Sequence, residues 1–169
     1  LAVPYCYLLG FTDEYGNVFI MDGDYRKETP PEEQFMFIKD TRAYYGVRPD
    51  NHILADPDIF RRKGLNKGTV GKSLNDMFMD AGIHCIRGNN DIANGIIKVS
   101  QYLIPQRNHA NPITGVFNSP YLYISDKVEF LINEFTSYYW KRDPRGEILD
   151  IPTDKDDHAM DTIKYALSH

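Results

Sequence analysis

The end of the chain holds the densest group of side chains that could carry out chemistry. Residues 154–161, DKDDHAMD, contain four carboxylates and one imidazole. Carboxylates this close repel one another, so they are tolerated where water solvates them, where they cap a helix, or where a cation neutralises them. The stretch taken alone leaves helix capping and metal binding both open.

A short helix is expected to carry these acids. Asp154 suits the N-cap position, with Asp157 three residues later near the positive end of the helix dipole. Helical spacing from Asp157 then separates an apolar side from a polar side. The apolar side would hold Met160, Ile163 and Leu167, and the polar side Asp157, His158, Asp161 and Lys164.

A second acid, Asp56, follows the apolar run 52–55, which predicts a buried strand. An acid before proline suits a turn, but ligands of open α/β sheets bind at the carboxyl ends of strands. Two-metal phosphodiester cleavage draws carboxylates from separate elements around two Mg²⁺ or Mn²⁺ ions about 4 Å apart. The long sequence separation of Asp56 from Asp157 and His158 is therefore no objection to a shared site.

Four basic residues lie in a loop that contains glycine: Arg61, Arg62, Lys63 and Lys67. Residues 66–73 nearly match a phosphate-binding loop, but asparagine replaces its first glycine and no buried strand precedes it. Nucleotide hydrolysis is therefore not expected. The loop either contacts a phosphate backbone or is simply solvated.

The remaining pattern indicates the elements that must position these groups. A hairpin is followed by strands that alternate with helices, which predicts an α/β fold with a mixed sheet, in the order of a ribonuclease H-like core. The expected strands are 5–11, 18–22, 52–55, 83–86 and 121–124, and the expected helices are 29–45, 73–81, 91–103, 125–139 and the closing one, with an irregular loop over 105–120.

Two of these helices have a predicted buried face. The face of helix 29–45 should contain Phe35, Ile38 and Ala43 or residues near them, and that of helix 125–139 should contain Val128, Leu131, Ile132, Phe135 and Tyr139. Ser125 or Asp126 is expected to cap the second helix.

Composition is consistent with one globular domain spanning residues 1–169. The chain is 42% hydrophobic and 25% charged, and its net charge of -5 argues against wholesale coating of nucleic acid or membrane. It contains no apolar run near the roughly 20 residues of a membrane helix. Cys6 and Cys85 are interpreted as reduced core residues. The opening on Leu1 suggests a piece excised from a larger protein.

Four segments resemble the C-terminal nuclease domain of tailed-phage terminase large subunits. They read GNVFIMD at 16–22, ILADP at 53–57, NDIANGI at 90–96 and DHAMDTIKYA at 157–166. The last of them is the most specific.

The resemblance implies a ribonuclease H-like endonuclease that cuts concatemeric viral DNA during genome packaging with Mg²⁺ or Mn²⁺. It implies Asp56, Asp157 and His158 as catalytic and metal-binding residues, and it leaves open whether Asp157 or His158 is the direct ligand. Asp161 would only support the helix. With this function, the basic loop residues Arg61, Arg62, Lys63 and Lys67 would hold the DNA backbone.

The implied partners are double-stranded DNA, the terminase ATPase domain, the small terminase subunit and the portal, in the cytoplasm of the infected bacterial host. The first metal-binding aspartate of the family would lie upstream of Leu1, and Asp13 and Asp22 are poor substitutes for it. A fold short of that carboxylate could instead be a non-catalytic docking module of the packaging motor.

Overall fold

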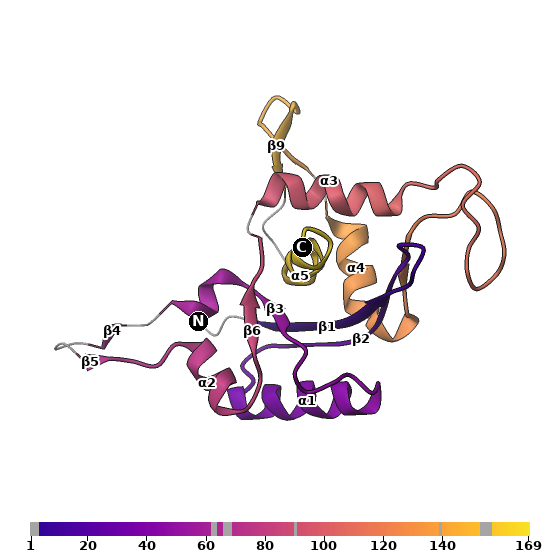
Figure 1. Ribbon diagram of the computed structural model, residues 1–169. Coiled ribbons are helices and arrows are strands. Elements are labelled where there is room, and N and C mark those ends of the chain that lie inside the picture. Colours follow the sequence, from indigo (N-terminus) through magenta and orange to yellow (C-terminus); the bar gives the residue numbers. More distant parts are fainter. Residues whose placement is uncertain (1–3, 62–63, 66–68, 90, 139, 153–156) are drawn as a thin grey trace.

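The computed structural model describes residues 4–61, 64–65, 69–89, 91–138, 140–152 and 157–169 (Figure 1). Its strands are β1 (Tyr5–Thr12), β2 (Val18–Arg26), β3 (Ile53–Ala55), β4 (Gly64–Leu65), β5 (Thr69–Val70), β6 (Cys85–Arg87), β7 (Leu122–Ile124), β8 (Trp140–Arg142) and β9 (Ile148–Pro152). Its helices are α1 (Pro31–Tyr44), α2 (Leu74–Asp80), α3 (Ile92–Leu103), α4 (Glu129–Ser137) and α5 (His158–Leu167), with short 3-10 turns at Pro57–Phe60 and Asp126–Val128. The predicted α/β fold is confirmed.

A mixed three-stranded sheet forms the centre of the fold. β1 and β2 pair antiparallel, and β7 runs parallel to β2 on its other side. The hairpin turn is built by Asp13, whose carboxylate accepts hydrogen bonds from the backbone N–H groups of Tyr15 and Asn17 at 2.9 and 2.8 Å. Asp13 is thus a turn residue, as its position in the sequence indicated.

β3 and β6 form a separate parallel pair, in which Ala55 lies opposite Arg87. The register is extended by one residue, since the N–H of Gly88 donates to the carbonyl of Ala55 at 2.8 Å. Both strands end at the same edge of this pair. Asp56, which follows Ala55, is therefore placed at the carboxyl end of a parallel strand pair, where the sequence predicted it.

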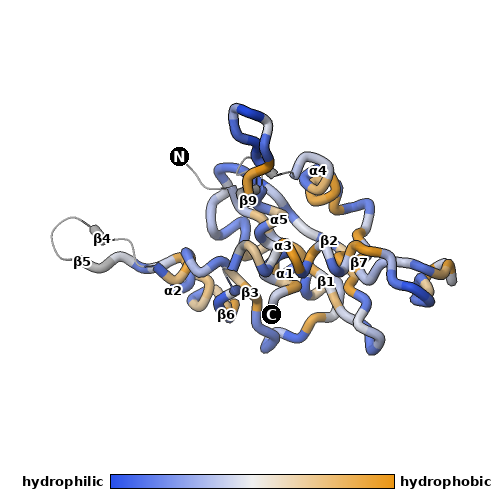
Figure 2. The backbone as a smooth tube through the Cα atoms, turned by 90° about the horizontal axis from the view of Figure 1, so that it is seen from above, coloured by the Kyte–Doolittle hydropathy of each residue, from blue (hydrophilic) through white to orange (hydrophobic). Residues whose placement is uncertain are grey.

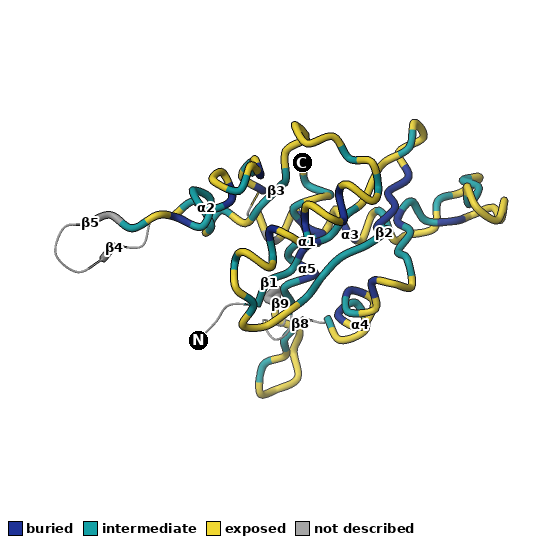
Figure 3. Tube along the Cα trace, turned by 90° about the horizontal axis from the view of Figure 1, so that it is seen from below, coloured by how far each residue is buried: buried dark blue, intermediate teal, exposed yellow. Residues whose placement is uncertain are grey.

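Helices cover the central sheet on both sides (Figure 1). Side chains alternate along β1, so that Tyr7 joins one hydrophobic core with α1 and α2, while Cys6 and Leu8 pack against another core with α3, α4 and α5. Figure 3 shows the buried segments gathered at the centre, with the tip of the β8–β9 hairpin exposed. The same tip is hydrophilic in Figure 2.

The structure corrects several predictions. Residues 64–65 and 69–70, where a basic loop rather than a strand was expected, form the β4–β5 hairpin, and residues 140–152, for which no strand was predicted, contain the β8–β9 hairpin. In α1, Phe35 and Ile38 are buried as expected, but Arg42 is buried and Ala43 exposed. In α4, Ile132 is 38% exposed, whereas the helical spacing had placed it on the inner face; Tyr139 lies outside the described residues.

The cysteines agree with the prediction. Cys6 in β1 and Cys85 in β6 are both free and partly buried. Burial raises the pKa of the Cys6 thiol to about 12 and that of Cys85 to about 11, so both are protonated at neutral pH. Within the described residues, no helix has both the length and the apolar character needed to cross a membrane.

Candidate metal centre

Asp56 is exposed and both of its carboxylate oxygens accept a hydrogen bond. The backbone N–H of Asp58 donates to Oδ1 at 2.7 Å, and this contact caps the 3-10 turn that starts at Pro57. The hydroxyl of Tyr165, on α5, donates to Oδ2 at 3.0 Å. Asp56 is thus a turn former and is also tied to the closing helix; each oxygen retains lone pairs for a cation.

Asp157 and His158 lie together at the start of α5. The Asp157 side chain makes no capping hydrogen bond, although its backbone carbonyl accepts from the N–H of Asp161 at 2.8 Å. Burial and the nearby charge of Asp161 raise the pKa of Asp157, while His158 opposes this shift. The His158 ring stacks on Tyr25 of β2, with centroids 6.2 Å apart. Asp154, predicted as the helix cap, lies outside the described residues.

One face of α5 connects these groups to Asp56. Asp157, Asp161 and Tyr165 are spaced four residues apart and so share a face. Their span along the axis is about 12 Å, but helical side chains lean toward the N-terminus, which carries the Tyr165 hydroxyl back toward Asp161. Burial, Asp56 and then Asp161 raise the pKa of Tyr165. The tertiary structure thereby brings Asp56 and α5 together.

Lys164 corrects the predicted polar face. It is only 5% exposed, and its ammonium forms an ion pair with Asp161 at 2.6 Å. The same nitrogen lies 3.3 Å from the hydroxyl of Tyr138 and 5.6 Å from the centroid of its ring. Burial lowers the pKa of Lys164, but Asp161 and Tyr138 outweigh it and the net shift is upward. Lys164 is therefore a buried cation that is paired with Asp161.

Glu134 of α4 is a second residue that sequence reasoning missed. Its Oε2 accepts hydrogen bonds from the backbone N–H groups of Ala159 and Met160 at 2.8 and 2.9 Å. The available signal was helical spacing, because Glu134 follows Leu131 of the predicted inner face by three residues, but its partner could not be read from the sequence. Glu134 contacts the turn that carries both Asp157 and His158.

The predicted DNA-contacting residues are only partly described. Arg61 is exposed and forms an ion pair with Asp58 at 3.2 Å. Arg62, Lys63 and Lys67 lie outside the described residues. Arg87, at the end of β6, lies over the ring of Phe60 at 4.8 Å and is a basic group near Asp56 that the sequence did not single out.

The side chains of Asp56, Asp157 and His158 are of chemical types that can bind a divalent cation. Carboxylate oxygens and an imidazole suit Mn²⁺, and oxygen donors suit Mg²⁺. Burial, and after it the charge of Asp161, raises the pKa of Asp157, and a bound cation would favour the charged carboxylate against both effects. Over the described ranges, however, no three or more His, Cys, Asp or Glu side chains form a ready-made metal cluster.

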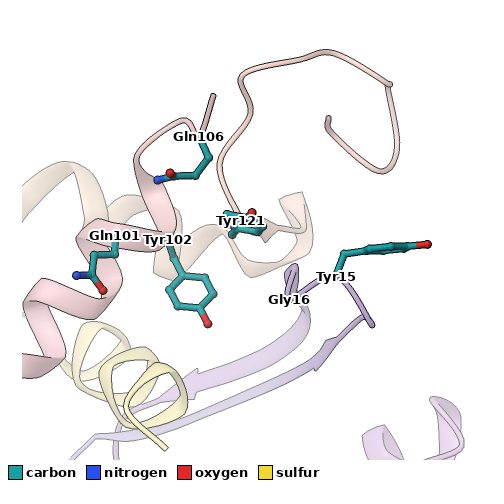
Figure 4. A pocket seen from close by; sticks show the side chains of 6 residues that line it. All are labelled: Tyr15, Gly16, Gln101, Tyr102, Gln106 and Tyr121. Atoms are coloured by element: carbon teal, nitrogen blue, oxygen red, sulfur yellow. The ribbon is translucent and has the colours of Figure 1, made fainter. Parts of the chain in front are cut away.

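A cavity elsewhere lacks such donors. It has a volume of about 450 Å³ and is lined by Tyr15, Gly16, Gln101, Tyr102, Gln106 and Tyr121 (Figure 4). These residues come from the tip of the β1–β2 hairpin, the end of α3 and the segment entering β7. Since its lining contains neither a carboxylate nor a cationic side chain, the cavity does not extend the acidic site.

Comparisons with known proteins agree with this architecture. Residues 93–169 match the family model of the terminase RNAseH like domain. The nuclease domain of the bacteriophage SPP1 large terminase, g2p, solved with bound Mn, aligns with 96% of this chain and 77% of that chain at a TM-score of 0.64 and 13% identity. The P22 large terminase nuclease domain aligns with 98% and 74%, at a TM-score of 0.61 and 15% identity.

The large terminase of a thermophilic bacteriophage aligns with 97% of this chain at a TM-score of 0.63 and 18% identity. The chain spans only 36% of that protein's length. A search of the curated proteins gave no match.

The fold and the comparisons define a ribonuclease H-like α/β domain. More particularly, its fold is similar to that of terminase nuclease domains and its residues 93–169 match the terminase family model, so the resemblance inferred from the sequence is confirmed.

Proposed function

We propose that this chain is a metal-dependent DNA endonuclease domain that cleaves concatemeric viral DNA during genome packaging. The observation that carries the proposal is the Tyr165–Asp56 hydrogen bond of 3.0 Å. It ties the acid that ends β3 to the helix that starts with Asp157 and His158. The terminase-type fold and the Mn-bound SPP1 neighbour support the same interpretation.

Asp56, Asp157 and His158 would hold Mg²⁺ or Mn²⁺, with oxygen and imidazole donors that match these ions. A divalent cation bound there supplies Lewis-acid stabilisation of the phosphoryl oxygens and lowers the pKa of water. Tyr165 holds one oxygen of the proposed donor Asp56, and Lys164 balances the charge of Asp161 on the same helix.

Arg61 and the neighbouring residues Arg62, Lys63 and Lys67 would contact the phosphate backbone of double-stranded DNA. Such contacts carry no base information and weaken with salt. The other proposed partners are the ATPase domain of a large terminase, a small terminase subunit and the portal, in the cytoplasm of an infected bacterium.

Asp56→Ala tests the assignment. The variant should lose Mn²⁺-dependent plasmid cleavage by at least about 100-fold, since metal-ion catalysis contributes several kcal/mol. Asp50→Ala is the matched control, because Asp50 is an exposed acid that precedes β3 rather than following it. Cleavage is measured as the conversion of supercoiled to nicked and linear plasmid.

Full cleavage by Asp56→Ala would refute the role of this residue. If the unaltered chain shows neither cleavage nor Mn²⁺ binding, the non-catalytic docking module becomes the better interpretation of this fold.

A further inference from the structure

Glu134 is a carboxylate buried in the apolar contact between α4 and α5. It is 7% exposed, and the hydrophobic core beside it includes Leu131 on its own helix and Ala159 and Met160 on the other. Burying a carboxylate is costly unless hydrogen bonds compensate it. Its partners therefore show what the residue contributes.

Those partners are first-turn amides of another helix. The first N–H groups of any α-helix lack intrahelical acceptors. These N–H groups are often capped by the side chain of the N-cap residue, but in α5 the N-cap residue Asp157 forms no side-chain capping bond. Oε2 of Glu134 instead accepts from the N–H groups of Ala159 and Met160 at 2.8 and 2.9 Å. The first turn of α5 is capped from α4.

We infer that Glu134 is a positioning residue that fixes the backbone of residues 157–160 and thereby places Asp157 and His158 for metal binding. This inference rests on the proposed function. Glu134 acts through the helix backbone, so its contribution lies in geometry rather than in contact with the ion or the DNA. Donors held this way need less reorganisation when a cation binds.

Glu134 also interacts electrostatically with His158 and Asp157. Burial raises its pKa, the two amide hydrogen bonds and His158 lower it, and Asp157 raises it further. Removing the side chain therefore changes both the cap and the local charge. Two substitutions separate these effects: Glu134→Ala removes both, whereas Glu134→Gln removes the charge and retains an oxygen that can accept both N–H groups.

The experiment measures Mn²⁺ affinity by isothermal calorimetry. If Glu134 acts by position, Glu134→Ala should bind Mn²⁺ about 10–100-fold more weakly, the range found for outer-shell residues. Glu134→Gln should bind within about threefold of the unaltered chain, because its cap survives. Equal losses in the two variants would overturn the inference and assign the effect to charge.

Val99→Ala controls for general destabilisation. Val99 lies on α3 in the same hydrophobic core and is 4% exposed. This variant should melt at a lower temperature but bind Mn²⁺ as the unaltered chain does. Matching Mn²⁺ affinities for Glu134→Ala and Val99→Ala would also overturn the inference.

Hydrogen exchange gives a readout that needs no metal. In Glu134→Ala the amides of Ala159 and Met160 should exchange faster, whereas in Glu134→Gln they should stay protected. Unchanged protection in Glu134→Ala would refute the positioning role whatever the metal result. Absence of Mn²⁺ binding by the unaltered chain would instead refute the proposed function, so the two failures are distinguishable.

Discussion

At the scale of single residues, one hydroxyl joins the two halves of the candidate site. Tyr165 donates to Asp56 at 3.0 Å, while the other oxygen of Asp56 is held by the N–H of Asp58. Without the Tyr165 hydroxyl, the Asp56 carboxylate loses one orienting contact and can rotate. Tyr165→Phe should therefore weaken Mn²⁺ binding about 10–100-fold. The loss in metal-free stability should stay near ~1 kcal/mol, the usual net value of one hydrogen bond.

The fold offers a matched control for this prediction. Tyr45 donates to Asp22 at 3.1 Å, which is the same pair of groups at nearly the same distance. Tyr45→Phe should therefore leave Mn²⁺ affinity unchanged, as calorimetry can show. Equal Mn²⁺ affinities for Tyr165→Phe and the unaltered chain would mean that Asp56 needs no such support.

At the scale of elements, Gly95 of α3 allows α5 to pack closely against α3. A Cβ added to Gly95 would lie 3.0 Å from Cβ of Lys164, close to its backbone. Alanine gains about 1 kcal/mol in helix propensity, but overpacking typically costs about 1–3 kcal/mol. We expect Gly95→Ala to lose up to about 2 kcal/mol net, which corresponds to a melting temperature up to about 8 °C lower.

Thermal unfolding followed by circular dichroism measures this loss. Ser100→Ala, an exposed position on the same helix, reports propensity alone and should be neutral or slightly stabilising. A Gly95→Ala variant that melts above the unaltered chain would show that α3 and α5 can separate without cost.

At the scale of the whole molecule, Asp157 makes the stability of the fold depend on pH. The pKa of Asp157 is raised by burial and by Asp161, so the folded state favours its neutral form. Stability from this group is fully present below its unfolded pKa of about 3.9 and is lost as the pH rises through the higher folded value. At neutral pH the charged Asp157 therefore destabilises the fold.

Asp157→Asn should accordingly raise the melting temperature at pH 8 in EDTA by about 1–3 °C, since screened interactions of this kind are worth less than about 1 kcal/mol. The gain should vanish near pH ~3.5, below the unfolded pKa. Asp126→Asn, at an exposed acid preceding α4, is the control for a general loss of negative charge. Destabilisation by Asp157→Asn at pH 8 would contradict the upward shift of the Asp157 pKa.

Local sequence patterns were enough to predict the element order and the periodic faces. Alternation between turn residues and apolar runs placed β1, β2, β3, β7 and all five helices, because those signals depend on local spacing. The closing motif also identified the terminase-type fold. Short hairpins such as β4–β5 escaped, since two-residue strands leave no period to detect.

The partners of each group, in contrast, depended on tertiary packing. Lys164 was predicted on a polar face, yet it is buried because Asp161 and Tyr138 satisfy its ammonium. Glu134 is buried because the amides of α5 donate to its carboxylate, and Tyr165 reaches Asp56, 109 residues away in sequence. Local spacing determines which side of a helix a residue occupies, whereas its contacts depend on elements distant in the chain, which is why these contacts could not be predicted from the sequence.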